Sequence, residues 1–270
     1  MAGRPRRASK ARGMAANSEV LTWLRKTVAK YEHDLVAVFR KQGTSAEWPL
    51  TAASPDELEQ KLAEGGHFVP LPKEPAALAN VLEVSLVDFL LDEADKTPGV
   101  DALRGTERGY PDLEMTGSAF GDGYHAVELK MARRNKTGSA TQSRITLYTG
   151  NTYFRYPTLQ WPGTFRPFED YDSHVDLIGI YTLDETLPGR ITDLELLVKE
   201  PWRIASRQRS STTREYIGAV QRLEDLREGN GEFETEEAFY KFWRAYPFSI
   251  GKAVAKQLDK LLAAQAPRKR

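Results

Sequence analysis

The sequence predicts an α/β protein that forms one domain, with a central mixed β-sheet flanked by helices. Helical patterns come first, strand candidates fill the middle of the chain, and helical patterns close it. The strand candidate at residues 177–181 is almost wholly apolar, as expected for a central strand covered on both faces. With 270 residues, the chain is long enough to bury an ample core.

The first part of the chain has helical patterns. Apolar residues at helical spacing form one stripe after Asn17: Leu21, Leu24, Val28, Tyr31, Leu35 and Val38. The run 54–57 places a capping serine before a proline and two acids, which predicts a helix start, and Gly65-Gly66 predicts its end. A longer helix is expected over 76–94, where Glu83 among apolar neighbours is first interpreted as a partly exposed residue.

A motif of the form PD(x15)ELK lies in the middle of the chain. Pro111-Asp112 is followed by fifteen residues and then by Glu128-Leu129-Lys130. Residues 126–131 alternate, so Glu128 and Lys130 would project from the face opposite the core-facing side chains. A turn at 121–123 would pair this strand with residues 113–116 in a hairpin. The hairpin would bring two carboxylates and one ammonium together.

This patch suits a particular chemistry. Carboxylates with room for water are suitable ligands for Mg²⁺, and a bound metal can lower the pKa of water and stabilise charge on phosphate. The lysine could position the attacking water or help to deprotonate it. The hypothesis is metal-assisted hydrolysis of a phosphodiester, and the alternative is an ordinary solvated strand face, because such a motif also arises by chance.

The rest of the chain continues the α/β pattern. Strands are expected at 144–148, 175–182 and 194–199, and helices at 215–227, 236–246 and 251–263. Between them, residues 207–214 are polar, basic and without periodicity, which predicts a loop. Its Arg, Ser and Thr side chains are types that contact base edges in the major groove, although a solvated surface loop has the same composition.

Composition excludes several classes of protein. There is no cysteine, so disulfides and thiolate metal sites are excluded, and no apolar run is long enough for a transmembrane helix.

The basic residues 1–16 predict a disordered tail, and no apolar stretch follows them as in a secretory signal. The net charge is zero but basic and acidic residues are segregated along the chain, which suits a local cleft for a polyanion. A cytoplasmic, bacterial protein without a membrane partner is expected.

The quoted residues resemble the PD-(D/E)XK nucleases, and within them the EcoRV-like type II restriction endonucleases. The resemblance covers roughly 67–247 and includes the motif hairpin, the apolar strand at 177–181, the flanks of the polar loop, and the closing turn and helix at 229–244. It implies the restriction-endonuclease-like fold for a single domain over 17–265, with dimerisation and DNA-recognition elements.

The resemblance also implies residue roles. Asp112, Glu128 and Lys130 become the catalytic triad, with Glu83 as an additional acid, and the three acids become the metal ligands for Mg²⁺. Two DNA-binding loops follow from the same resemblance: Ser210, Ser211, Thr212, Thr213 and Arg214 in the major groove, and Thr106, Glu107 and Arg108 toward the minor groove. Both loops differ from the family pattern in sequence, so a different recognition sequence is expected.

The expected function is Mg²⁺-dependent cleavage of double-stranded DNA at a specific, palindromic site by a homodimer. Blunt ends with 5′-phosphates and a cognate DNA methyltransferase encoded nearby are further implications of the resemblance. Two alternatives stay open: a structure-specific repair or junction nuclease of the same fold, and a sequence-specific DNA-binding protein that does not cleave.

Overall fold

The central feature of the molecule is a five-stranded mixed sheet. The computed structural model describes residues 18–32, 53–54, 56–57, 75–106, 109–184 and 191–265. The strand order is β1-β2-β3-β5-β6, and only the β3–β5 pair is parallel. The strands are β1 Asp101–Arg104, β2 Leu113–Thr116, β3 His125–Arg133, β5 Ser173–Leu183 and β6 Ile191–Lys199. The predicted mixed sheet is therefore confirmed.

The hairpin predicted around the motif is present. β2 and β3 pair antiparallel, with Leu113 opposite Val127 and Met115 opposite His125. Between them lie the short 3-10 helix η1 (Ser118–Phe120) and Gly121, whose φ of 72° belongs to the left-handed region that glycine adopts without strain.

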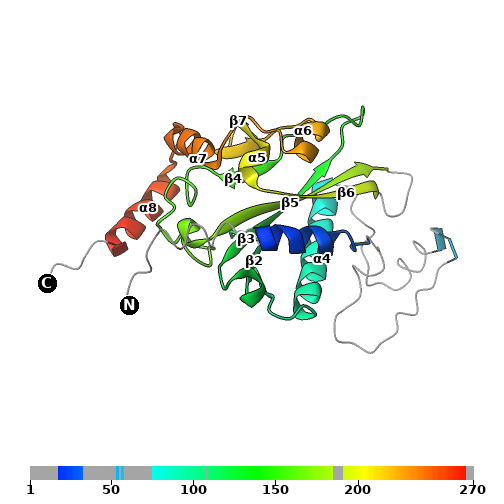
Figure 1. Ribbon diagram of the computed structural model, residues 1–270. Coiled ribbons are helices and arrows are strands. Elements are labelled where there is room, and N and C mark those ends of the chain that lie inside the picture. The colour runs from blue at the N-terminus through cyan, green and yellow to red at the C-terminus, as the bar shows by residue number, and fades with distance from the viewer. Residues whose placement is uncertain are drawn as a thin grey trace.

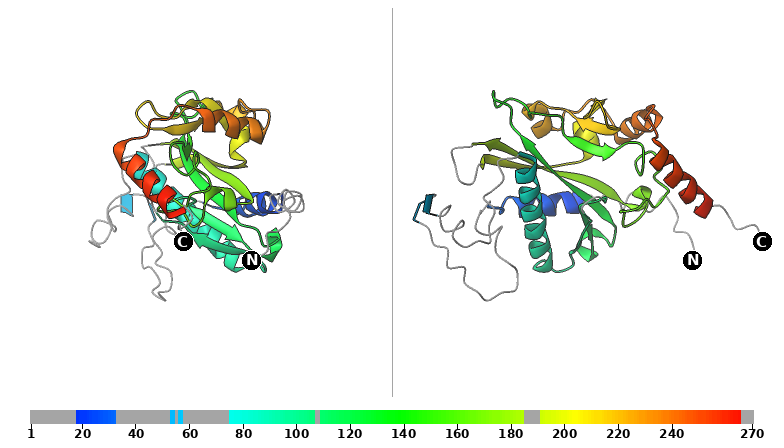
Figure 2. Two further views of the ribbon diagram at one scale, coloured as in Figure 1. Left: turned by 90° about the vertical axis from the view of Figure 1, so that its left-hand side faces the viewer. Right: turned by 180° about the vertical axis from the view of Figure 1, so that it is seen from behind.

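Two layers cover the central sheet, one on each face (Figures 1 and 2). On one face, α4 (Pro75–Asp95) and a helix over residues 18–28 pack against Val127 and Leu129 of β3. The opposite face carries Glu128 and Lys130, and a second apolar core lies over it. The alternation in the motif strand therefore separates two cores rather than a core and open solvent.

The second layer contains a three-stranded antiparallel sheet that the sequence did not predict. Its order is β4-β8-β7, with bounds Thr146–Thr149, Tyr216–Ala219 and Ala205–Arg209. The predicted helix at 215–227 is wrong in its first half, and only α6 (Leu223–Glu228) is helical. Ile217, Gly218 and Ala219 are all buried between two strands, so burial and strand pairing override the helical pattern.

Gly218 explains part of this outcome. A Cβ at this position would lie 2.3 Å from the Arg144 side chain and 2.7 Å from the backbone oxygen of Gln208. The absence of a side chain therefore lets β8 pass close to β7.

Helices complete the second layer and the C-terminal end. They are the short η2 (Phe168–Asp170) and α5 (Pro201–Ile204), then α7 (Glu236–Ala245) and α8 (Lys252–Gln265). The Thr235 hydroxyl caps α7 by accepting from the Ala238 amide at 3.1 Å. α8 extends away from the rest of the molecule in Figures 1 and 2. Within the described ranges, no helix is both long and apolar enough to cross a membrane.

The N-terminal predictions are only partly covered. The predicted stripe is buried at Leu21, Leu24 and Val28. The capping pattern at 54–57 is present, because Ser54 Oγ accepts from the Glu57 amide at 3.2 Å and Glu57 Oε2 accepts from the Ala53 amide at 2.6 Å. The tail at 1–16, the rest of the stripe at 35 and 38, and the glycines at 65–66 lie outside the described residues.

A group of aromatic rings surrounds His174 in the core between the two sheets. Its ring stacks on Phe168 with centroids 3.9 Å apart, and its Nδ1 lies 2.6 Å from the Tyr110 hydroxyl. Burial lowers the pKa of His174 to about 3, and the positive charge of Arg244 acts in the same direction. The imidazole is therefore neutral in the folded protein at neutral pH.

The protein is expected to lose stability as pH falls from 6.5 toward 3. In this range the unfolded chain protonates His174 and the folded chain does not, so the histidine costs at most about 1.4 kcal/mol of unfolding free energy per pH unit. Chemical denaturation of the protein and of His174→Gln at pH 7 and pH 5 measures this loss. The variant should lose less stability between the two pH values, and equal losses would contradict the assignment.

Candidate active site

The motif residues meet where β2 separates from β3. Strand pairing between the two ends at Leu113 and Val127, so beyond this point no described strand lies on that edge of β3. At this edge the Asp112 side chain replaces a strand partner, because its Oδ2 accepts a hydrogen bond from the Leu129 amide at 2.7 Å. Glu83 of α4 accepts a backbone hydrogen bond from Met131, the next amide on the same edge. Two carboxylates therefore satisfy amides that a neighbouring strand would otherwise bind.

Glu128 and Lys130 form an ion pair on the adjacent face of β3. Lys130 Nζ donates to Glu128 Oε1 at 2.6 Å, and the Glu128 residue is only 8% exposed. The other carboxylate oxygen, Oε2, is buried and has no hydrogen-bond partner among the described residues. A charge-assisted bond of this length in a buried setting holds both side chains in place.

Burial and neighbouring charges shift the pKa values of this group. Burial raises the pKa of Glu128 to about 7, with the Lys130 charge opposing the rise and Asp112 adding to it. Burial also raises the pKa of Glu83, again against the charge of Lys130. For Lys130, burial acts to lower the pKa, but the charges of Glu128 and Asp112 outweigh it and the pKa is raised. With these two carboxylates beside it, Lys130 is held in its protonated form, in which its ammonium can donate to a water molecule.

A pocket of about 390 Å³ opens beside these carboxylates. Glu83, Asp112 and Thr106 line it, together with Arg104 and Asn80. Thr106 was predicted to lie in the loop that faces the minor groove, and the structure places it next to two candidate acids. Glu107 and Arg108 of the same predicted loop lie outside the described residues.

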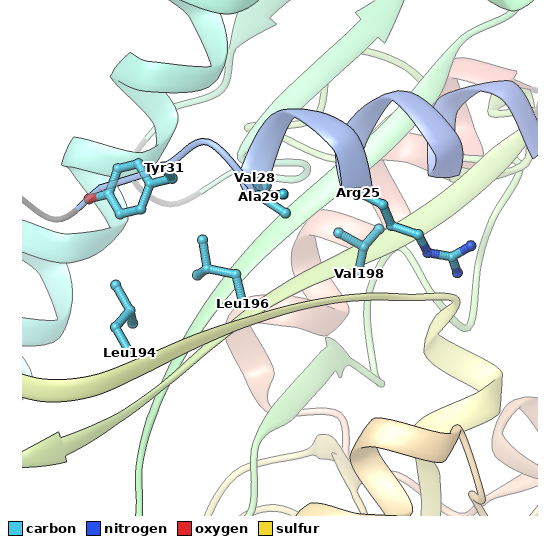
Figure 3. Close-up of a pocket in the computed structure, with 7 residues that line it drawn as sticks. All are labelled: Arg25, Val28, Ala29, Tyr31, Leu194, Leu196 and Val198. Carbon is cyan, nitrogen blue, oxygen red and sulfur yellow. The ribbon is translucent and has the colours of Figure 1, made fainter.

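A second pocket, of about 510 Å³, contains none of the candidate residues. Figure 3 shows that it lies between the helix at 18–28 and strand β6. The residues that line it are Arg25, Val28, Ala29, Tyr31, Leu194, Leu196 and Val198. The chemistry that the motif requires is therefore found at the smaller pocket.

The structure adds one acid that the sequence predictions omitted. Asp176 lies on β5 directly opposite Glu128 of β3, and it is completely buried. A single acid in the apolar run 175–181 was the signal available in the sequence. Its place beside Glu128 depends on the pairing of two distant strands, which local pattern does not reveal.

The predicted base-reading loop connects β7 to β8. Thr212, Thr213 and Arg214 are exposed, whereas Ser210 and Ser211 are partly buried. Ser211 Oγ accepts from the amides of Thr213 at 3.2 Å and Arg214 at 3.1 Å, so the serine shapes the turn. The loop was predicted over 207–214, but in the structure it begins only after Arg209, the last residue of β7.

Across the residues that the structure describes, no three His, Asp or Glu side chains form a ready-made metal cluster. The donor set nevertheless fits a divalent cation, since Glu128 Oε2 is a buried oxygen without a partner and Asp112 and Glu83 line the adjacent pocket. The Lys130 ammonium now occupies the other oxygen of Glu128.

The fold is restriction-endonuclease-like, with a mixed central sheet that contains the motif hairpin. The acid on α4 completes the group of candidate residues beside that hairpin. Residues 44–264 match the family model described as Restriction endonuclease EcoRV. The chain is also similar to the type II restriction enzyme EcoRV of Escherichia coli, with 21% identity over 197 residues that cover 67% of this chain and 78% of that enzyme. The chain belongs to the EcoRV restriction endonuclease family and is a type II site-specific deoxyribonuclease.

Proposed function

We propose that the protein is a Mg²⁺-dependent restriction endonuclease whose active site consists of Asp112, Glu128, Lys130 and Glu83. The observation that carries this proposal is the edge of β3 beyond Val127, where Asp112 and Glu83 bind successive amides beside the Glu128–Lys130 pair. Sheet pairing, helix packing and a charge pair thus converge on one place. A solvated strand face would not bury Glu128 to this extent.

Asp112, Glu128 and Glu83 would hold the cation, which when bound supplies positive charge for a phosphate oxygen and lowers the pKa of water. Lys130 keeps its proton and places an ammonium where negative charge develops on the phosphate. The Asp112 side chain fixes the geometry of the hairpin through the Leu129 amide.

Recognition of DNA is assigned to two loops. Residues 210–214 would read base edges in the major groove, and residues 106–108 would lie toward the minor groove. Arg214 is held only loosely, because its Nη1 lies 3.4 Å from the Tyr216 hydroxyl and its guanidinium 5.9 Å from that ring. It is therefore able to turn toward a base.

Replacing Arg214 with alanine is expected to relax the recognition sequence at one symmetric pair of positions. A bidentate arginine–guanine contact contributes about 1–3 kcal/mol of discrimination, which corresponds to roughly 10- to 100-fold in cleavage preference. Cleavage of a library with randomised sites measures this preference. Arg222→Ala is the control, because Arg222 is exposed and pairs with Glu224 outside the loop. Unchanged preference in Arg214→Ala would remove the assignment.

The active form is proposed to be a homodimer that cuts a palindromic site, since a two-fold protein matches a two-fold site and each chain cuts one strand. Residues 17–265 would form the single endonuclease domain that carries both the dimer and DNA contacts. Blunt ends with 5′-phosphates, a methyltransferase encoded nearby and a cytoplasmic location in a bacterium complete the proposal.

Digestion of plasmid and phage DNA with Mg²⁺, followed by sequencing of the fragment ends, tests this function. The expected result is cutting at one repeated sequence that differs from the site of EcoRV, with blunt ends. Cutting only at junctions or nicks would instead indicate a structure-specific nuclease. Retarded migration of DNA without cutting would indicate a binding protein.

A further inference from the structure

Asp176 is a buried acid to which the proposed active site gives no role. It is 0% exposed, and neither carboxylate oxygen has a hydrogen-bond partner among the described residues. A buried carboxylate without partners is costly, and proteins retain such groups mainly where they serve a function. Its presence in an otherwise apolar strand therefore requires an explanation.

The position of Asp176 points to Lys130. β3 and β5 pair in parallel, with Asp176 opposite Glu128 and Lys130 opposite Ile178, so all three polar side chains share one face. Neighbouring strands lie about 4.8 Å apart, and a lysine side chain reaches a diagonal neighbour across that spacing. Burial raises the pKa of Asp176, and Lys130 is the main charge that opposes this rise.

The existing partner of Lys130 is also a proposed cation ligand. Lys130 Nζ donates to Glu128 Oε1, and a divalent cation on Glu128 would repel that ammonium. Asp112 offers no replacement, because its Oδ2 already accepts from the Leu129 amide and it is itself a proposed ligand. Glu114 and Glu195 lie on the same face of the described sheet, but arginine side chains already bind both of them. Asp176 lies next to the pair and has no hydrogen-bond partner among the described residues, so it can accept from Lys130.

We propose that Asp176 is a positioning residue that receives the Lys130 ammonium when Glu128 binds the cation. Asp176 then holds the Lys130 side chain within the site, instead of leaving it without a partner in a buried place. The role rests on the proposed function, since it presupposes that Glu128 binds a cation and that Lys130 acts in cleavage.

The variant Asp176→Asn tests this role because asparagine keeps the shape and removes the charge. Three quantities are measured: the single-turnover cleavage rate with Mg²⁺, the dissociation constant for DNA, and the dissociation constant for Mg²⁺ by calorimetry without DNA. We expect the rate to fall by about 10- to 100-fold, as for other residues that orient an active-site group, with both dissociation constants within about twofold of the original. Asp172→Asn, an exposed acid just before β5, is the matched control.

A double-mutant cycle with Lys130→Met separates positioning from other roles. If Asp176 acts through Lys130, adding Asp176→Asn to Lys130→Met should cause no further loss of rate. Additive losses would overturn the proposal, as would a Mg²⁺ dissociation constant raised about tenfold, which would make Asp176 a cation ligand. An unchanged rate in Asp176→Asn would leave Asp176 with a structural role only.

Folding and function are checked separately. The melting temperature of Asp176→Asn should be close to that of the original protein, because asparagine has the same shape and no hydrogen bond of Asp176 to a described residue is lost. If asparagine does fold poorly, Asp176→Leu supplies an apolar replacement of which the same loss of rate is expected. Failure of the original protein to cut DNA with Mg²⁺ would refute the proposed function, whereas cutting by the original and Asp176→Asn at equal rates would refute the positioning role alone.

Discussion

Replacing Asp112 with alanine is expected to lower the rate of DNA cleavage by about 10³-fold or more. Such a factor corresponds to about 4 kcal/mol of lost transition-state stabilisation, which is the scale of a metal's contribution to charge stabilisation on phosphate. Asp112 combines two tasks, since Oδ2 accepts from the Leu129 amide and the side chain lines the pocket with Glu83. Alanine removes both.

Asparagine separates the two tasks at this position. The amide oxygen of Asp112→Asn still accepts from the Leu129 amide, but the negative charge is lost. We expect both variants to lose cleavage, and only alanine to lower the unfolding free energy, by about 1–3 kcal/mol for the unsatisfied amide. Single-turnover cleavage and chemical denaturation measure the two effects.

A matched control for Asp112 is Asp101→Ala on β1, where the aspartate is exposed and at the edge of the same sheet. This control should cleave at the rate of the original protein. Full Mg²⁺-dependent activity in Asp112→Ala would refute the assignment of the active site. A loss of cleavage in alanine alone, with asparagine fully active, would show that only the hydrogen bond matters.

Local sequence patterns predicted the parts of the site that lie on one hairpin. The alternation over 126–131 places Glu128 and Lys130 on one face of a strand. The glycines at 121 and 123 predict the turn that brings this strand beside Asp112. The structure confirms this hairpin, but it adds that the functional face is covered by a second core. Whether a face meets solvent depends on residues far along the chain.

Non-local pairing accounts for what the sequence did not reveal. Asp176 reaches Glu128 only because β3 and β5 are parallel neighbours, and no period within either strand encodes that choice. In the same way, residues 216–219 have a weak helical pattern but are buried as β8 between β4 and β7. Side chains that meet through such pairing are the ones that a linear pattern omits.

Replacing Lys130 with methionine is expected to slow cleavage strongly and also to destabilise the protein. Methionine keeps the apolar stem but removes the ammonium that donates to Glu128 Oε1 at 2.6 Å. Cleavage should fall by about 10²- to 10³-fold, the usual effect of losing a group that stabilises developing charge. The loss of one partner from a buried ion pair should lower the unfolding free energy by about 3–5 kcal/mol at a pH where Glu128 is charged.

The destabilisation should depend on pH in a defined direction. Burial already raises the pKa of Glu128 to about 7 from the ordinary value of 4.5, and Lys130 is the main charge that holds it down. Without Lys130 the folded pKa rises further, so the variant should lose stability as pH increases through and above 7, where the unfolded chain is already ionised. Thermal melts of the two proteins at pH 6 and pH 8.5 measure this difference.

A second substitution separates catalysis from folding. In Lys130→Met/Glu128→Gln the buried charge is absent, so the melting temperature should recover at high pH while the cleavage rate stays at or below that of Lys130→Met. Lys136→Met, which changes an exposed lysine after β3, is the control and should leave both quantities unaltered. Normal cleavage by Lys130→Met would remove the lysine from the proposed mechanism. Recovery of cleavage in the double variant would mean that the single variant failed only because it was unstable, and that the ammonium contributes nothing to the chemistry.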